Sequence, residues 1–310
     1  MLCVLGFDGG GTKTECVALG VTGEILARGR GSASNPSRIG VAPALRGVQE
    51  SANTALRSIP TFPTTPRVAA VCAGLAGTGK EELRLEMARG LEAIFEGAVV
   101  RVQTDLELAL AALPEGPGIV LVAGTGSAAI GRDAKGSVRR EGGLGPSGSD
   151  EGSAFDIGRA VASAVRDEKT IVEMELSRQI LRHLGCASWA DVDARASAQP
   201  DEIFPRIFPV VTAAAEAGNK LAQSLLVAGA GKLAALTERL AQTLGLGSQS
   251  FFLGRTGGML ERSQVFDKAL DAEIQRRLPR AVKAQASADA ALVAARTALG
   301  LLQAGQGAAL

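Results

Sequence analysis

Residues 2–20 read LCVLGFDGGGTKTECVALG, which is two apolar runs separated by three consecutive glycines. The runs at 2–8 and 13–20 are short and bounded by turn residues, a pattern that predicts two β-strands. A Thr-Gly turn follows, and residues 23–31 (GEILARGRG) predict a third strand. The chain therefore opens on a β-meander, in which consecutive strands pair with their neighbours.

Helices and strands alternate after this meander. Residues 39–58 and 79–95 have the apolar spacing of amphipathic helices, while 67–74 (RVAAVCAG) and 99–105 (VVRVQTD) predict strands. The last of these strands is expected to end on Asp105. Such an alternation is typical of α/β proteins, in which ligands gather at the carboxyl ends of the strands.

The opening pattern recurs in the second half of the chain. Residues 118–126 (GIVLVAGTG), 127–133 (SAAIGRD) and 137–143 (SVRREGG) again predict strands with a glycine turn between the first two. A helical, alanine-rich region follows, and then 250–254 (SFFLG) predicts a strand and 288–302 a helix. The chain is therefore predicted to be internally duplicated, with one nucleotide held between two related lobes.

Charge and hydropathy exclude several classes of partner. The 310 residues include 33 Lys and Arg against 32 Asp and Glu, so we expect binding neither to nucleic acid nor to an anionic membrane. No basic leader precedes the first apolar run, and no run is long enough for a membrane helix, which predicts a cytoplasmic protein.

We expect neither a catalytic nor a metal-binding role for the cysteines and the histidine. The four cysteines are scattered without a CxxC pair, which favours buried reduced thiols over zinc, an iron-sulfur cluster or disulfides. His183 is the sole histidine and falls in an apolar helical stretch, so we set aside mechanisms that use a Ser-His or Cys-His pair.

The first glycine turn has the composition of an anion-binding loop. Gly10 and Gly11 allow backbone N–H groups to approach an anion, while Thr12 adds a hydroxyl and Lys13 a positive charge. The Walker A spacing is absent, so a plain hairpin turn would explain this stretch equally well if it stood alone.

Two more glycine turns favour nucleotide binding. One repeats the strand, glycine, threonine order of the opening turn, and it consists of Gly124, Thr125, Gly126 and Ser127. Two such turns can hold a polyphosphate from opposite sides. The other contains Gly257 and Gly258 between an aromatic strand and a helix, which suits close approach of the backbone to a base or ribose.

Two acidic residues are candidates for phosphoryl-transfer chemistry. Asp105 is expected at a strand end, where its carboxylate can orient an attacking hydroxyl and accept its proton. It could equally be the N-cap of the next helix. Asp8 precedes the first glycine turn, and its oxygens suit Mg²⁺, which keeps several water ligands. A strand-end carboxylate with no metal is the alternative.

Two other polar residues suit the hydroxyls of a sugar. Asp150 ends a glycine-dense loop and opens a helix, so it either caps that helix or accepts hydrogen bonds from a polyol. Asn35 follows the third predicted strand, and its amide offers both a donor and an acceptor. A turn asparagine is the simpler interpretation for Asn35 taken alone.

Several of these motifs together resemble those of one family. The stretches are FDGGGTKT, TDLELALAA, AGTGSAAIGRD, GGLGPSGSDEGSAFDIG and TGGML, in this order along the chain. They resemble the BadF/BadG/BcrA/BcrD ATPase family, and within it the N-acetylglucosamine kinase branch. The resemblance covers essentially the whole chain.

The resemblance implies a fold and a domain organisation. It implies an α/β protein with duplicated RNase H-like lobes, of the actin/hexokinase/Hsp70 type, around an ATP cleft. The N-terminal lobe would be 1–113 and the C-terminal lobe 114–286, the latter with a helical insertion. A final helix at about 287–303 would pack back on the first lobe.

The resemblance also implies a function: a sugar kinase that uses ATP and Mg²⁺ and forms a homodimer. It would transfer the γ-phosphate to an amino sugar of N-acetylglucosamine or glucosamine type. Thr12 and Thr125 would bind the phosphates, Asp105 would contact the sugar and act as the base, and Gly257 and Gly258 would lie by the adenosine. The residues lining the sugar pocket would be Asn35, Gly143, Leu144 and Asp150.

One position departs from the kinase pattern. Leu144 stands where these kinases usually have Trp, so a flat aromatic wall against the sugar is missing. The sugar therefore stays open among N-acetylglucosamine, glucosamine, N-acetylmuramic acid and another hexose. Two other functions also stay open: an ATPase activator of a dehydratase or reductase, which needs cluster-ligating cysteines, and a sugar sensor without catalysis.

Overall fold

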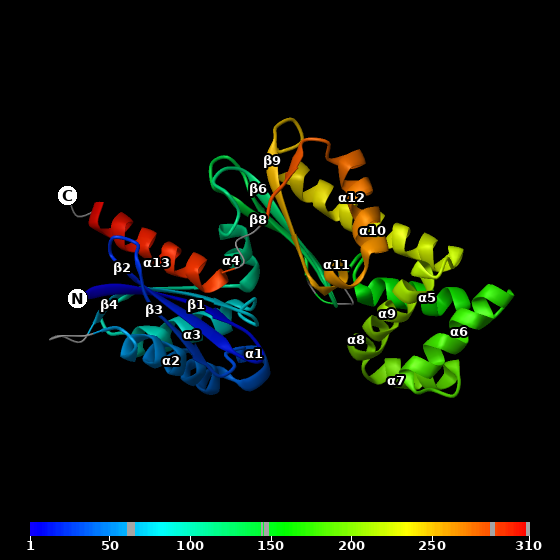
Figure 1. The fold of residues 1–310 in the computed structure, drawn as a ribbon, viewed down its shortest axis with the longest axis horizontal. Helices are drawn as coiled ribbons and strands as arrows, with labels where there is room; N and C mark the ends of the chain where they lie inside the picture. The colour runs from blue at the N-terminus through cyan, green and yellow to red at the C-terminus, as the bar shows by residue number, and fades with distance from the viewer. Residues whose placement is uncertain (61–65, 144, 146–148, 286–288, 308–310) are drawn as a thin grey trace. The chain divides into compact units, whose positions relative to one another are not determined.

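The chain forms two compact units. The structure is a computed structural model of residues 1–310, and it describes all of them except 61–65, 144, 146–148, 286–288 and 308–310. One unit is Met1–Leu113 together with Ala286–Leu310, and the other is Pro114–Gln285. We refer to them as unit 1 and unit 2 (Figure 1).

Unit 1 contains a five-stranded mixed sheet. Its strands are β1 (Leu2–Gly9), β2 (Thr14–Gly20), β3 (Ile25–Gly31), β4 (Arg67–Leu75) and β5 (Val99–Gln103). They lie in the order β3-β2-β1-β4-β5. The meander β1-β2-β3 is antiparallel, whereas β4 and β5 run parallel to β1. The predicted β-meander followed by parallel strands is confirmed.

Helices cover both faces of this sheet (Figure 1). They are α1 (Pro36–Ile39), α2 (Val41–Arg57), α3 (Glu81–Ile94), α4 (Asp105–Ala111) and α13 (Ala290–Gly307). Side chains alternate between the faces along a strand: Leu5 packs in a core with α2 and α3, and Val4 in a core with α4 and α13. Helix α13 lies very close to β1, since a Cβ on Gly6 would be 1.9 Å from Ala295 N.

Unit 2 repeats this topology. Its strands are β6 (Gly118–Ala123), β7 (Ser127–Arg132), β8 (Val138–Gly142), β9 (Phe251–Thr256) and β10 (Ala281–Lys283). The order β10-β9-β6-β7-β8, read from the other end, matches that of unit 1, with β7 and β8 antiparallel and β9 and β10 parallel. The duplicated RNase H-like fold is therefore confirmed. No sequence pattern indicated the short β10.

The sheet of unit 2 shares one large core with a set of helices. These are α5 (Ala154–Val165), α6 (Ile171–Leu184), α7 (Trp189–Ala198), α8 (Pro200–Ile203), a 3₁₀ turn (Phe204–Ile207), α9 (Phe208–Glu216), α10 (Lys220–Thr243), α11 (Gly258–Arg262) and α12 (Gln264–Arg277). Buried side chains from β6, β9, α5, α10 and α12 all belong to this core.

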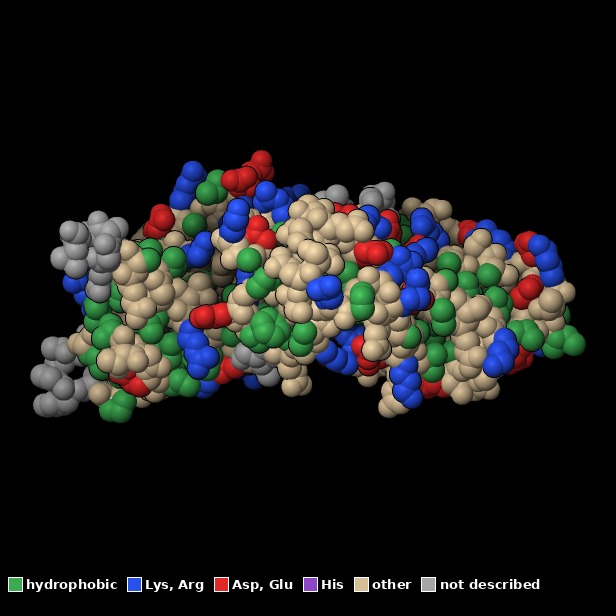
Figure 2. Space-filling model, turned by 90° about the horizontal axis from the view of Figure 1, so that it is seen from above, with side chains coloured by type: hydrophobic (Ala, Val, Ile, Leu, Met, Phe, Trp, Pro, Cys, Tyr) green, Lys and Arg blue, Asp and Glu red, His purple; other side chains and the backbone are tan. Residues whose placement is uncertain are grey.

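Acidic and basic side chains mix on the surface. Figure 2 shows them interspersed over the visible face, as expected for 33 Lys and Arg against 32 Asp and Glu. Within the described parts of the chain, no helix combines the length and apolar character needed to cross a membrane.

Candidate active site

The first glycine turn joins β1 to β2 and exposes its middle residues. Gly9 pairs with Thr14, and the turn is closed by the Gly10 N–H, which donates to Lys13 O at 3.0 Å. Gly11 and Thr12 are exposed, and their N–H groups have no partner among the described residues. Two free N–H groups and a threonine hydroxyl, with Lys13 beside them, are groups suited to binding an anion.

A buried hydrogen-bond network fixes this turn to the segment after β3. The Ser34 N–H donates to Gly10 O at 3.0 Å. Thr14 Oγ1 donates to Ser32 O at 2.6 Å and shares a 2.8 Å hydrogen bond with Ser34 Oγ. Thr14 and Ser34 are both fully buried. Gly9 has to be glycine here, because a Cβ would lie 2.0 Å from Ser34 Oγ. The sequence did not single out Thr14 or Ser34.

Asp8 lies where negative charge accumulates at the end of β1. Burial raises the pKa of its carboxyl, the nearby Glu15 and Asp105 carboxylates raise it further, and Lys13 lowers it. A hard oxygen donor in such surroundings fits a divalent cation. The described residues contain no group of three or more His, Cys, Asp or Glu that could hold a metal. Mg²⁺ bound at Asp8 would thus take its other ligands from water and phosphate.

Asp105 is the first residue of α4 rather than the last of a strand, and the N-cap interpretation is wrong. The strand β5 ends at Gln103, and Thr104 is the cap. Thr104 Oγ1 accepts from the Glu107 N–H at 3.1 Å, and Glu107 Oε2 accepts from the Thr104 N–H at 2.7 Å. The exposed Asp105 carboxylate accepts a 3.0 Å bond from its neighbour Leu106 N–H. Its remaining acceptor capacity is available to a ligand.

Asn35 is a buried helix cap that uses the oxygen of its side-chain amide and not the nitrogen. Its Oδ1 accepts from the Ser37 N–H at 3.1 Å and from Ser37 Oγ at 2.7 Å, so it begins α1. Gly77, at φ +85°, approaches so closely that a Cβ there would be 2.1 Å from this Oδ1. Capping accounts for the oxygen, and the Nδ2 group has no hydrogen-bond partner among the described residues.

The second glycine turn, between β6 and β7, is packed against the start of α5. Gly124 N–H donates to Gly126 O at 3.0 Å, while the Gly124 and Thr125 carbonyls accept from the Ala154 and Phe155 N–H groups at 3.0 and 3.1 Å. With their carbonyls held by α5, Thr125 and Gly126 have N–H groups with no partner among the described residues. These two donors suit an anion.

Asp150 is buried beside this second turn and does not cap α5. The cap is Ser153, whose Oγ accepts from the Asp156 N–H at 3.2 Å. Asp150 Oδ1 instead accepts from the Ser127 N–H at 3.1 Å, and burial raises the pKa of its carboxyl despite this bond. A Cβ on Gly126 would be 2.8 Å from Oδ1. The carboxylate therefore lies directly against the turn.

The other predicted sugar residues lie on the same loop as Asp150. Gly143 O accepts from Arg140 Nη2 at 2.6 Å, which ties the start of the loop to β8. Leu144 is outside the described residues.

Asp156 is a residue that the sequence did not single out. It is buried, and its Oδ2 accepts from the Gly152 N–H at 2.9 Å and from Lys232 Nζ at 2.7 Å. Burial alone would raise the pKa of Asp156, but these hydrogen bonds outweigh it and the pKa is lowered. Asp156 thus holds the end of the Asp150 loop onto α10. The spacing Ser153-x-x-Asp156, typical of helix starts, was the available signal.

The third glycine turn contains one structurally required glycine and one that is free. Gly257 has φ +116°, and a Cβ on it would lie 2.2 Å from Ala123 O at the end of β6. Around Gly258 a Cβ would meet only Arg262 Nε at 3.9 Å. Just before the turn, the side chain of Arg255 is buried and pairs with Asp267 and Asp271 on α12 at 3.1 and 3.0 Å.

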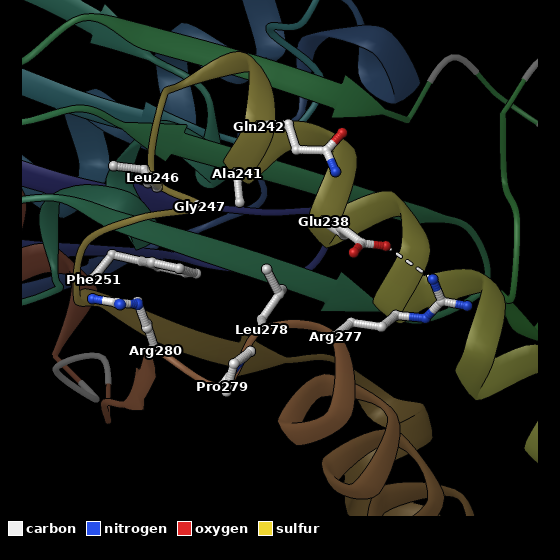
Figure 3. Close-up of a pocket in the computed structure, with 10 residues that line it drawn as sticks. All are labelled: Glu238, Ala241, Gln242, Leu246, Gly247, Phe251, Arg277, Leu278, Pro279 and Arg280. Carbon is white, nitrogen blue, oxygen red and sulfur yellow. Dashed lines mark hydrogen bonds and ion pairs between the residues drawn. The ribbon is translucent and has the colours of Figure 1, made fainter.

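A small cavity of unit 2 lies away from these groups. It measures about 180 Å³ and is lined by Phe251, Leu278 and an ion pair of 2.9 Å between Arg277 and Glu238 (Figure 3). It is at the start of β9, whereas Gly257 follows the end of that strand. Ligands of open α/β sheets bind at the carboxyl ends of strands, so this cavity is not the candidate nucleotide site.

The cysteines are buried thiols. Cys3, Cys16 and Cys72 are buried in the sheet of unit 1, and Cys186 is partly buried. Burial raises the pKa of Cys3 to about 11 and that of Cys72 to about 12. Ligation of an iron-sulfur cluster uses thiolates, and these environments disfavour that form.

Comparison with known proteins places the chain in a family. Its fold is the duplicated α/β fold of actin-like ATPases and sugar kinases, and each unit presents a glycine turn with free N–H groups. The model of the BadF/BadG/BcrA/BcrD ATPase family matches residues 5–298. The chain belongs to this family.

Three similar proteins illustrate the relationship. The N-acetyl-D-glucosamine kinase of Dictyostelium discoideum is 28% identical over 309 residues, which is 95% of this chain and 97% of that protein. An N-acetylmuramic acid/N-acetylglucosamine kinase of Clostridium acetobutylicum is 29% identical over 84% of this chain and 86% of its own. A crystal structure of a proposed N-acetylglucosamine kinase from Chromobacterium violaceum is 26% identical, with a TM-score of 0.69 over 97% and 99% of the two chains.

Proposed function

We propose that this protein is an ATP-dependent sugar kinase that phosphorylates a hydroxyl of an amino sugar of N-acetylglucosamine or glucosamine type. The family and the names of the similar proteins support this class of reaction. The observation that carries it is the exposed Asp105 carboxylate. Thr104 caps α4 in its place, and Asp105 is near enough to Asp8 to raise the pKa of that residue.

In this proposal the glycine turns bind the nucleotide. The Gly11 and Thr12 N–H groups with Lys13, and the Thr125 and Gly126 N–H groups, donate to phosphate oxygens of ATP. Gly257 and Gly258 let the backbone approach the adenosine. Asp8 would hold Mg²⁺, which supplies positive charge to the phosphates when it is bound.

The chemical step needs a proton acceptor beside the sugar. The hydroxyl oxygen attacks the γ-phosphorus, and the bond from this phosphorus to the oxygen shared with the β-phosphate breaks, so that ADP leaves with that electron pair. Asp105 accepts the proton of the attacking hydroxyl. Positioning and electrostatic stabilisation provide most of the catalysis in such reactions.

Four of the predicted residues would contact the sugar. Asn35 Nδ2 donates to a sugar hydroxyl, and the Asp150 carboxylate, with one bond from the Ser127 N–H, accepts from another. Gly143 and Leu144 would form the wall of the pocket. Leu144 in place of an aromatic residue suits a sugar whose binding does not depend on a flat stacking surface.

The deciding experiment measures ADP release from MgATP with N-acetylglucosamine, glucosamine, N-acetylmuramic acid, glucose or no sugar. Strong stimulation by one amino sugar supports the kinase and names its substrate. ATP hydrolysis at a rate that does not depend on sugar, together with iron absorbance, would favour an activator of a dehydratase or reductase. Sugar binding without ADP release would favour a sensor. Light scattering after size exclusion tests the proposed homodimer.

A further inference from the structure

We propose that Arg38 is a phosphate-binding residue of this site. Its guanidinium, together with the free N–H groups of Gly11 and Thr12, would receive the terminal phosphate of the nucleotide. This inference rests on the proposed kinase function and extends it to a residue that no sequence motif indicated.

Arg38 lies directly over the first glycine turn. Its Nη1 is 3.2 Å, and its Cζ 3.9 Å, from the position that a Cβ on Gly11 would occupy. Arg38 is exposed. Its backbone N–H donates to Asn35 O at 3.1 Å, but its guanidinium has no ion pair or hydrogen bond among the described residues. Lys13, the cation within the turn itself, is paired with Glu15. Arg38 is therefore a cation beside the turn whose charge is uncommitted.

The position of Arg38 is determined by the packing of the segment that carries it. Ser34, four residues earlier, is fully buried and hydrogen-bonded to Gly10 and Thr14. Asn35 then caps α1, and Gly77 packs against this cap. A segment held at three points has little freedom to move its third helical residue away from the turn, so Arg38 is not an arginine on a loose surface loop.

The arrangement places opposite charges on opposite faces of the sheet. A Cβ on Gly9 would point at Ser34, on the face from which α1 and Arg38 approach. Successive strand residues face opposite ways, so Asp8 is on the other face, that of α4 and Asp105. A phosphate on the turn would have Arg38 on one side and the carboxylate site for Mg²⁺ on the other.

The chemistry of arginine suits this position. Its planar guanidinium donates up to five hydrogen bonds and binds phosphate oxygens in pairs, and it stays charged at every physiological pH. The terminal phosphate carries the most negative charge of ATP, and charge on it shifts during transfer. We therefore expect Arg38 to distinguish ATP from ADP and to stabilise the transition state.

The test compares Arg38→Met with wild type in the full chain. With Mg²⁺ present, calorimetry should show ATP affinity reduced by about 10- to 100-fold and ADP affinity by less than about threefold. The kcat should fall by about 10- to 100-fold while the KM for the sugar stays within about twofold. Arg38→Lys should recover part of the loss. Arg57→Met, an exposed arginine at the end of α2, is the matched control and should change nothing.

Each outcome has a defined meaning. Unchanged ATP affinity and kcat in Arg38→Met would overturn the role of Arg38 alone, because wild-type binding of ATP would still support the kinase. A rise confined to the KM for the sugar would also overturn it and assign Arg38 to the sugar. Wild-type protein that does not bind ATP would overturn both proposals. Since Arg38 is exposed, circular dichroism is expected to show unchanged folding in both Arg38 variants.

Discussion

The two strand-turn-strand hairpins share a topology but differ in what surrounds their glycine turns. In unit 1 the turn between β1 and β2 exposes Gly11 and Thr12 and has Lys13 and Arg38 beside it. In unit 2 the turn between β6 and β7 is packed on α5, and the buried Asp150 carboxylate touches it. Duplication preserved the backbone. The first turn has the basic Lys13 and Arg38 beside it as well as the acidic Asp8, whereas the second has the buried, acidic Asp150.

From this contrast we predict different roles for the carboxylates of Asp150 and Asp105. Asp150 is buried and bonded to the Ser127 N–H, which suits a fixed acceptor for a sugar hydroxyl. Asp105 is exposed, and among the described residues its carboxylate accepts a hydrogen bond only from its own neighbour Leu106, which suits a group that has to take up a proton. The first prediction tests this division.

We expect the largest effect from Asp105→Asn, which should lower the kcat for sugar phosphorylation by about 100- to 10,000-fold because a general base is lost. ATP affinity should stay close to wild type. Asp150→Asn should instead act mainly on the KM for the sugar. Steady-state kinetics of both variants, with the exposed Glu86→Gln as control, decide between them. A greater kcat loss in Asp150→Asn than in Asp105→Asn would reverse the assignment.

Alanine substitutions at the two adjacent glycines of the third turn should differ in their effect on stability. Gly257→Ala would force a side chain into positive φ and within 2.2 Å of Ala123 O, so we expect a loss of about 2 to 4 kcal/mol in the free energy of unfolding. Gly258→Ala has open space and is the matched control. Urea unfolding of both variants is the measurement. Equal stabilities would contradict the close approach of Gly257 to β6.

Alanine substitutions in the first and second glycine turns should change the KM for different substrates. In Gly126→Ala the new methyl group would meet the Asp150 carboxylate at 2.8 Å, so the KM for the sugar should rise by about tenfold. In Gly11→Ala the contact at 3.2 Å is with the end of the flexible Arg38 side chain, and we expect the KM for ATP to rise by about two- to fivefold. The opposite pattern of KM changes would break the proposed contrast between the turns.

The smallest predicted effect is on stability at Asp8. Burial raises the pKa of this carboxyl above 3.8, so the folded protein holds the proton more tightly than the unfolded chain. This contribution to stability is present at low pH and is lost as the pH rises through the folded pKa. Asp8→Asn should therefore raise the Tm at pH 7.

The pH dependence provides the check on that prediction. Thermal unfolding of Asp8→Asn and wild type should show the difference in Tm shrinking as the pH falls from 7 through the folded pKa of Asp8 toward 3.8. Glu86→Gln should show no such trend. A lower Tm for Asp8→Asn at pH 7 would mean that the ionised carboxylate stabilises the fold.

Local patterns in the sequence were sufficient to predict the strands and turns. The apolar runs around FDGGGTKT and AGTGS predict the hairpins, and their recurrence predicts the duplication. The strand β10 was missed because Ala281–Lys283 is a three-residue strand whose last two residues are exposed, and no apolar run marks it. Its position comes from pairing with β9, which is a long-range contact.

The helix caps were mispredicted because neighbouring residues compete for the same position. Thr104 and Asp105 are both good caps, and Thr104 is selected because Glu107 completes a capping box with it. Ser153 rather than Asp150 caps α5, and its Oγ accepts from the N–H of Asp156, three residues further on. In both places the cap was thus readable from residues three positions apart. The proposed role of Arg38 could not be predicted from the sequence, because it follows from the packing of α1 near a turn that is distant in sequence.

Helix α13 gives the protein an order of assembly during synthesis. It packs on β1 at Gly6 and, together with α4, covers one face of the sheet of unit 1, with Val4, Val17, Ala70 and Leu108 in that core. It follows unit 2 in the sequence. On a ribosome, the strands that are made first therefore lack α13 on this face until all of Pro114–Gln285 has been translated. Unit 2, although made second, is the part that can finish folding first.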